Sequence, residues 1–228
     1  MEGSIINAAA IALGGFAGLL AGGRLPERLV KIIMQSVSLA VLMVGIDMGL
    51  RTKNSVIVLL SIVLGGLIGE SLQIEERFNH LSERLEARYT ANGDGRFTKG
   101  FVTASLLYCV GPMAITGAFQ NGLLGDASIL ITKSFLDGIS AIALGAGLGY
   151  GVIFSAIPVL LYQGGLALGA TWLKPLLSQA VVLEMTATGG VLILGIALTM
   201  LEIKKVKVAN LLPALFVVVP IVYLWQRF

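Results

Sequence analysis

The chain of 228 residues has little of what soluble enzymes use for chemistry, with one cysteine, one histidine and 13% charged residues. A single cysteine, Cys109, excludes an internal disulfide and a metal site built from several cysteines. The sequence has no Walker loop, no HExxH zinc motif and no dinucleotide fingerprint after a strand. We therefore expect no enzyme activity, no metal site and no cofactor. The net charge of +3 is accounted for by loop Lys and Arg, so we expect no nucleic-acid partner.

Apolar residues are what the chain has in abundance: 56% of it is hydrophobic, and its mean hydropathy is +0.90. About 20 consecutive apolar residues cross a bilayer as a helix, and the chain holds about eight such runs. It is therefore predicted to be an all-α, polytopic transmembrane helix bundle, one integral domain over residues 1–228 in contact with the lipid bilayer. The predicted spans are 5–23, 30–50, 54–72, 100–120, 127–149, 152–173, 179–201 and 207–226.

Two stretches of the chain, 5–72 and 155–222, align without a gap as copies of one three-span unit. Gly14-Gly15-Phe16-Ala17 falls on Gly164-Gly165-Leu166-Ala167 in this register. With two spans between the copies, over 100–150, the second copy would be inverted relative to the first, as in many secondary transporters. The alternative is a chance match between two glycine-rich apolar stretches.

The one long polar stretch, 73–99, has apolar residues at spacings of three and four, which predicts an amphipathic helix. It is expected to lie along the cytoplasmic surface, or to serve as a docking site for a soluble partner. Basic residues concentrate in the loops after the first, third and seventh spans. The positive-inside rule then places both termini outside the cytoplasm.

Ionisable side chains within a span are costly and invite functional hypotheses. Lys133 and Asp137 stand one helical turn apart, so they face each other and either form a site or neutralise each other for insertion. Glu184 precedes Thr186, Thr188 and a pair of glycines, a pattern that can open a helix toward a cavity. The alternative is a Glu near the span entrance with threonines bonded to their own helix. In the repeat register this patch falls on Gln35 and its neighbours.

Helix breaks are predicted at Gly111–Gly117, where Pro112 removes a backbone donor, and at Pro158. Each break is either a mechanical kink or a discontinuous helix whose ends meet a solute. Gln163 lies one turn beyond Pro158 at mid-span. The predicted substrate- or ion-binding residues are Asp137, Glu184, Gln163, Gln35, Thr186, Thr188, Lys133, Asn121, Gly111 and Pro112.

Four stretches carry a family resemblance: 101–115 (FVTASLLYCVGPMAI), 133–140 (KSFLDGIS), 154–164 (FSAIPVLLYQG) and 208–214 (VANLLPA). In these the chain resembles the uncharacterised bacterial inner-membrane family of the YqgA and YdfK type, domain-of-unknown-function family 554. The resemblance implies a multi-spanning protein of the bacterial inner membrane with a role in transport, and it implies no particular substrate.

Together these observations predict a small secondary transporter of a solute or ion, coupled to protons or cations, with a polar site at the membrane midplane. The alternatives are an ion channel and a membrane scaffold or sensor that transports nothing. Glycines four residues apart allow close helix packing within one chain or between two copies in a homodimer.

Overall fold

The computed structural model describes residues 1–22, 26–77, 80, 96–109, 112–173 and 175–226, and its described secondary structure is helical. The helices divide into two units, each described by itself. Unit 1 comprises Met1–Val37 with Glu86–Lys174, and unit 2 comprises Ser38–Leu85 with Pro175–Phe228. The predicted surface helix at 73–99 falls mostly outside the described residues.

Unit 1 holds four helical segments that pack against one another, besides the first half of α2 (Glu27–Gly49). Its single helices are α1 (Glu2–Gly22) and α7 (Ser128–Leu148). The other two segments each consist of two consecutive helices. The first is α5 (Arg96–Cys109) with α6 (Pro112–Leu124), and the second is α8 (Tyr150–Phe154) with α9 (Ala156–Leu168). A short helix, α10 (Ala170–Leu173), follows α9.

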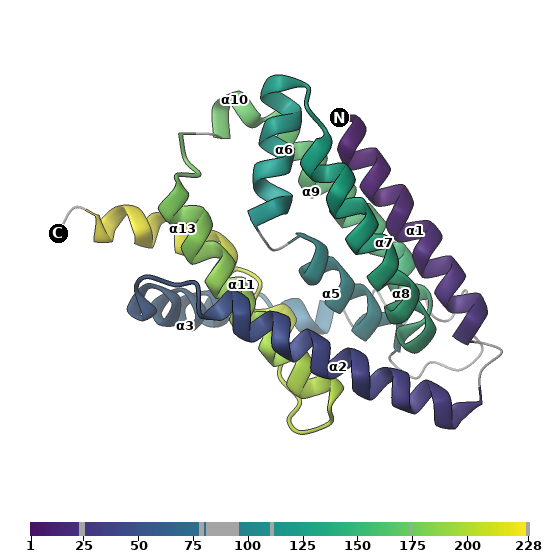
Figure 1. Ribbon diagram of the computed structural model, residues 1–228. Helices are drawn as coiled ribbons and strands as arrows, with labels where there is room; N and C mark the ends of the chain where they lie inside the picture. Colours follow the sequence, from purple (N-terminus) through teal and green to yellow (C-terminus); the bar gives the residue numbers. More distant parts are fainter. Residues whose placement is uncertain (23–25, 78–79, 81–95, 110–111, 174, 227–228) are drawn as a thin grey trace. The chain divides into compact units, whose positions relative to one another are not determined.

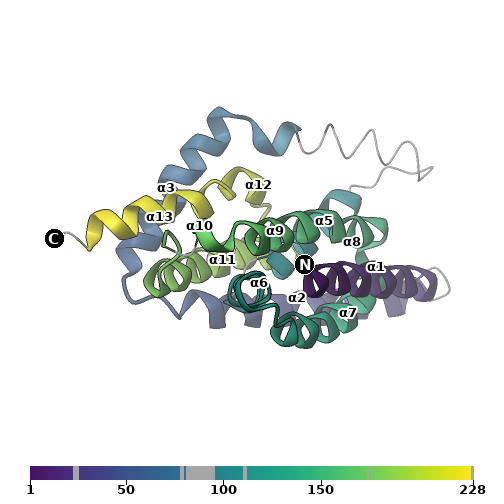
Figure 2. The same cartoon turned by 90° about the horizontal axis from the view of Figure 1, so that it is seen from above.

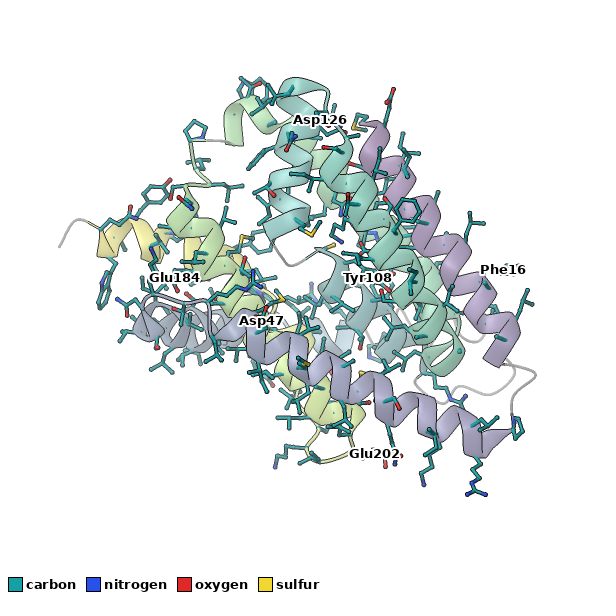
Figure 3. All side chains as sticks on the ribbon, viewed as in Figure 1. Phe16, Asp47, Tyr108, Asp126, Glu184 and Glu202 are labelled. Atoms are coloured by element: carbon teal, nitrogen blue, oxygen red, sulfur yellow. The ribbon has the colours of Figure 1, made fainter. Side chains whose placement is uncertain are left out.

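The α1–α7 pair is the tightest contact in unit 1, and the two helices lie side by side in Figures 1 and 2. Gly14 lies on the backbone of Gly138, Gly18 on that of Ile142, and Gly145 on that of Gly15. Glycines at this spacing let two helix backbones approach closely in lipid. Phe16, on the same helix, is exposed and labelled in Figure 3, so α1 turns Gly14 and Gly18 inward and Phe16 outward.

One bend and one milder interruption in unit 1 lie beside prolines predicted to disturb the helix. α5 ends at Cys109 and α6 begins at Pro112, and the segment is bent by 59°. Gly117 lies within α6, so the break is shorter than the predicted Gly111–Gly117. The second interruption is a single residue, Ser155, which keeps helical dihedrals, so α8 and α9 form one continuous span over Tyr150–Leu168. Pro158 has no N–H to donate to the carbonyl four residues earlier, at the end of α8.

Unit 2 is built from the second half of α2 (Glu27–Gly49), α3 (Ser55–Ser71), α11 (Gln179–Met200), α12 (Val208–Leu211) and α13 (Ala214–Trp225). Side chains cap two of these helices. Asn54 accepts a hydrogen bond from the Val56 N–H at the start of α3, and Ser178 accepts one from the Val181 N–H at the start of α11. Such caps satisfy donors that a helix start leaves open.

Helices of the two predicted repeat copies pack in antiparallel pairs. Met1, directly before α1, lies beside Gly164 of α9, whereas Gly15 of α1 lies beside Ile153 of the preceding short helix. In α3, Gly65 meets Ala214, and Gly69 meets Asn210.

The third pair, α2 and α11, is antiparallel as well. Gly45 of α2 lies beside Leu194 of α11, and Gly49 lies beside Val191 and the backbone of Gly190. Each of the three helices of residues 5–72 therefore runs opposite to the helix at the matching place in 155–222.

Fewer helices qualify as membrane spans, judged by their length and composition, than the eight predicted. In the described part of the chain five helices are long and apolar enough to cross a bilayer, and six if the bent α5–α6 pair is one span. The two remaining predicted spans coincide with apolar stretches of only 10–17 residues, Gln35–Gly49 and Ser55–Ser71.

Alanine at Gly18 is expected to destabilise the protein, because a Cβ there would collide with the backbone of Ile142. Forcing atoms into a packed interface costs about 1–3 kcal/mol. Gly165→Ala is the matched control, because no atom of the described residues lies within 4 Å of its Cβ position and alanine favours helix by about 1 kcal/mol. Thermal unfolding of the purified protein in detergent should show a lower melting temperature for Gly18→Ala only. Equal melting temperatures for the two variants would contradict the packing described.

Candidate functional site

A buried ion pair lies in the middle of α7. The Lys133 ammonium contacts the Asp137 carboxylate, and the two side chains are only 8% and 10% exposed. Asp137 is nine residues into a helix of 21, which places it roughly 14 Å from the nearer end at 1.5 Å per residue. A hydrocarbon core is about 30 Å thick, so a helix that crosses it carries Asp137 near the midplane.

Two fully buried amides complete the surroundings of the acid. Asn7 of α1 donates through Nδ2 to Asp137 Oδ2 at 3.0 Å and to Gln163 Oε1 of α9 at 3.2 Å. An amide nitrogen has two hydrogens, so one Asn can make both bonds. Asn7 therefore links α1, α7 and α9 through polar side chains in the interior of unit 1.

Each of these amides also has one buried atom without a hydrogen-bond partner in the described part of the chain: Asn7 Oδ1 and Gln163 Nε2. An unpaired buried donor or acceptor costs about 1–3 kcal/mol, so native proteins keep few of them. One of these atoms is an acceptor and the other a donor. A water molecule or a polar solute that offers both kinds of group would satisfy them together.

Tyr108 brings the fourth segment of unit 1 to the ion pair. It lies in the last turn of α5, next to the break before α6, and is labelled in Figure 3. Its ring centroid is 5.7 Å from the Lys133 ammonium, within the range of a cation–π interaction. Its hydroxyl lies 3.1 Å from that of Ser140. We call Asn7, Tyr108, Lys133, Asp137 and Gln163 the Asp137 cluster.

Three members of this cluster were predicted from the sequence: Lys133, Asp137 and Gln163. Asn7 and Tyr108 were not predicted. Asn7 could have been predicted from the sequence, because burying its amide in an apolar span costs free energy, as it does for Gln163. Asn121 of α6 is also buried in unit 1, and its Oδ1 has no partner among the described residues. Gly111 lies outside the described residues, and Pro112 is the first residue of α6.

Glu184 belongs to unit 2, where the loop between α2 and α3 holds its carboxylate. Thr52 donates its hydroxyl to Oε2 at 2.5 Å, and the backbone N–H of Lys53 donates to Oε1 at 2.9 Å. Glu184 is buried in the second turn of α11, where it is labelled in Figure 3. These bonds satisfy the carboxylate and tie the loop to α11.

The other predicted polar residues have varied surroundings. The Thr186 hydroxyl donates to the Val182 carbonyl of its own helix at 2.7 Å. Thr188 is fully buried, and its hydroxyl has no partner among the described residues. Gln35 is exposed on α2. Because Asp137 and Glu184 belong to different units, their predicted convergence on one pocket stays a prediction.

A second polar cluster in unit 2 ties the end of α3 to the start of α12. Glu70 accepts from Lys207 at 2.9 Å and from the buried Asn210 at 2.6 Å. Asn210 accepts from the backbone N–H of Glu75, and Glu75 accepts from that of Ala209. The hydrogen bond and charge of Glu70 raise the pKa of Lys207 above its ordinary value.

In unit 1 the loop between α6 and α7 holds Asp126, labelled in Figure 3. The backbone N–H of Ser128 donates to its carboxylate at 2.9 Å, and the Gln120 side chain donates as well. Both bonds favour the ionised acid, which lowers the pKa of Asp126.

Apolar spanning helices around buried polar groups define a multi-span helical membrane protein. Residues 2–223 match the family model described as "Protein of unknown function (DUF554)". The chain is 35% identical to the "Uncharacterized protein YqgA" of Escherichia coli (strain K12), over 98% of this chain and 97% of that protein. It is 31% identical to the "Uncharacterized membrane protein YdfK" of Bacillus subtilis (strain 168), over 100% and 98%. No solved structure matches. The chain belongs to the DUF554 family, as the sequence resemblance predicted, and is a membrane protein.

Thr52→Val is expected to destabilise the protein, because it removes the hydroxyl that donates a hydrogen bond to Glu184 while keeping the shape of the side chain. Hydrogen bonds to charged groups contribute about 1.5–3 kcal/mol. Thr132→Val is the control, since that exposed hydroxyl bonds only to its own helix in the contacts described, and its loss should cost under about 0.5 kcal/mol. Melting temperatures in detergent, measured also for Glu184→Ala and for the double variant, give the coupling of the pair. Additive losses would show that the contact contributes nothing.

Proposed function

We propose that the protein is a small secondary transporter and that the Asp137 cluster of unit 1 is its solute or ion site. The observation that carries the proposal is the buried carboxylate halfway along α7, held by Asn7 and Lys133 beside unpaired amide atoms. Side chains from all four segments of unit 1 surround this point. In this proposal the carboxylate binds and releases a ligand, and the protein is not an enzyme.

The energetics favour a binding role over mere neutralisation. An isolated ionisable group at the centre of a span costs about 2.5–3.5 kcal/mol on insertion scales, and Lys133 alone suffices to offset the charge of Asp137. Asn7 and Gln163 add two further buried amides, each with an unpaired atom. These amides add desolvation cost without being needed for charge balance. A ligand that bonds to them explains why they lie beside the acid.

The break between α5 and α6 fits a solute site. A broken helix exposes carbonyl groups at the end of one half and N–H groups at the start of the next, and transporters use such ends to coordinate solutes. α5 ends one residue after Tyr108, so its last turn carries a cluster residue.

The antiparallel pairs support an inverted repeat of residues 5–72 and 155–222. A two-fold axis in the membrane plane would turn each helix of the first copy into an oppositely directed helix of the second. The pairs α1 with α9, α2 with α11 and α3 with α13 all run this way. An inverted repeat also implies eight crossings, with α2 and α3 as short spans.

The remaining elements of the proposal follow from the sequence. We propose a bacterial inner-membrane location with both termini outside the cytoplasm, based on the basic loops. Glycine spacing on the helices is compatible with a homodimer, and Glu184, Gln35, Thr186 and Thr188 remain candidates for a further polar lining in unit 2.

Asp137→Asn is expected to abolish transport, because it removes the charge and one strong acceptor from the site. Losing a hydrogen bond to a charged group corresponds to a decrease of about tenfold or more. Purified protein in liposomes is assayed with a panel of probes: Na⁺, K⁺, chloride, glycine, urea and glycerol. Asp47→Asn is the matched control, because Asp47 forms an ion pair of the same spacing with Arg51 but on the exposed surface of α2.

The control variant should retain the flux of the original protein. If Asp137→Asn carries the same flux as the original protein for every probe that moves, the Asp137 cluster is not the transport site. If no probe moves in any variant above empty liposomes, the transport proposal itself fails for these solutes.

A further inference from the structure

We propose that the solute of the Asp137 cluster is a small neutral primary amide that bridges Asn7 and Gln163. The inference rests on the proposed transport function and adds the chemical class of the solute. It is carried by two fully buried atoms without a hydrogen-bond partner among the described residues, the Asn7 Oδ1 acceptor and the Gln163 Nε2 donor. These atoms belong to adjacent amides, because Asn7 Nδ2 donates to Gln163 Oε1 at 3.2 Å.

The Asp137 carboxylate determines which way both amides face. An ionised carboxylate only accepts hydrogen bonds, so Asn7 must turn its NH₂ group toward Asp137 and its carbonyl oxygen away. The same NH₂ group donates to Gln163, which must therefore present its own carbonyl oxygen there and direct its nitrogen elsewhere. Turning either amide over would bring two acceptors or two donors together. The unpaired acceptor and the unpaired donor thus follow from the position of the buried acid.

The two unpaired atoms are close enough for one amide group to reach both. The oxygen and the nitrogen of an amide are about 2.3 Å apart, as its bond lengths require. With one such separation at each end of the 3.2 Å contact, Asn7 Oδ1 and Gln163 Nε2 are at most about 7.7 Å apart. A ligand amide with a hydrogen bond of about 2.9 Å at each end spans up to about 8 Å. Its N–H would donate to Asn7, and its carbonyl would accept from Gln163.

The charge of the cluster favours a neutral solute. Lys133 and Asp137 already balance each other as an ion pair. A charged solute beside this pair would leave a net charge in the buried interior, which is strongly unfavourable. A primary amide carries donors and an acceptor without any charge. Acetate has the shape of acetamide, but it is charged and has no donor for Asn7, so the site should exclude it.

A third unpaired group matches the second N–H of a primary amide. Ser4 is fully buried on α1, one helical turn before Asn7, and its hydroxyl has no partner among the described residues. Side chains at this spacing are neighbours on a helix. Acetamide would therefore use both N–H groups and its carbonyl. Urea has a second NH₂ group and glycerol a hydroxyl on every carbon, so each would bury more polar groups without partners, which weakens binding.

The experiment uses the full chain in liposomes and follows solute entry by stopped-flow light scattering, with empty liposomes as the baseline. Acetamide should enter faster than the baseline and urea more slowly than acetamide, whereas glycerol and water should stay at the baseline. In detergent, acetamide should raise the melting temperature, because a ligand that binds only the folded protein stabilises it. Acetone, which has the carbonyl without the N–H groups, and acetate should leave the melting temperature unchanged.

Two variants test the unpaired groups directly. Gln163→Met keeps the length of the side chain and removes the donor, so acetamide entry above the baseline should fall about tenfold or more. Gln179→Met, at the exposed start of α11, is the matched control and should behave as the original protein. Ser4→Ala removes a hydroxyl that has no partner in the described residues, so the melting temperature should be retained while acetamide entry falls about fivefold.

Several outcomes overturn the inference. Acetamide entry at the baseline, or equal entry in the original protein, Gln163→Met and Ser4→Ala, would show that these groups hold no amide. Faster entry of water alone would show that the unpaired atoms bind water only. If flux that depends on Asp137 appears for Na⁺, K⁺, chloride, glycine or glycerol but for no amide, this inference fails and the proposed transport function stands. If no flux depends on Asp137, both fail together.

Discussion

An ionised carboxylate in the middle of a membrane helix must be neutralised and hydrogen-bonded, and the organisation of unit 1 follows from that requirement at Asp137. Lys133 supplies the opposite charge from one turn away on the same helix. Asn7 then supplies a donor from a different helix, which requires α1 to lie close to α7. The glycines of α1 make that approach possible, since Gly14 rests on the backbone of Gly138, the residue after Asp137. The hydrogen bond from Asn7 to Asp137 and the close approach of Gly14 to Gly138 therefore depend on each other.

Local patterns in the sequence predicted the parts of this arrangement that lie within one helix. The apolar runs matched the described helices in position, the α5–α6 break lies at Pro112, and the one-turn spacing of Lys133 and Asp137 predicted their contact. Partners far apart in sequence escaped prediction. Asn7 and Asp137 are separated by 130 residues, and Thr52 and Glu184 by 132, so no local period links them. A lone Asn or Thr in an apolar run can also have a purely structural role, because its side chain can form a hydrogen bond within its own helix.

The proposed repeat relates helices of the two halves of the chain, but it does not relate the residues of the Asp137 cluster to one another. In the repeat register Asn7 falls on Ile157 and Gln163 falls on Leu13, so neither amide has a polar counterpart. Lys133 and Asp137 lie between the two copies and belong to neither. A duplicated frame would thus supply paired antiparallel helices, while the inserted segments α5 to α7 supply the charges. The helices around such a site would be related by the repeat, whereas the polar side chains within it would not be.

The packing around the cluster combines two kinds of contact. α1 and α7 touch backbone to backbone at several glycines, so moving one relative to the other would break a continuous close contact. α9 is joined to this pair by a side-chain bond, from Asn7 to Gln163, and it meets α6 at the close approach of Gly122 to the Ala167 backbone. Dense interiors resist displacement, so the glycine contacts hold the helices in place while Asn7 sets the polar link between them. A substitution at Asn7 would therefore disturb the polar link without removing the close helix packing.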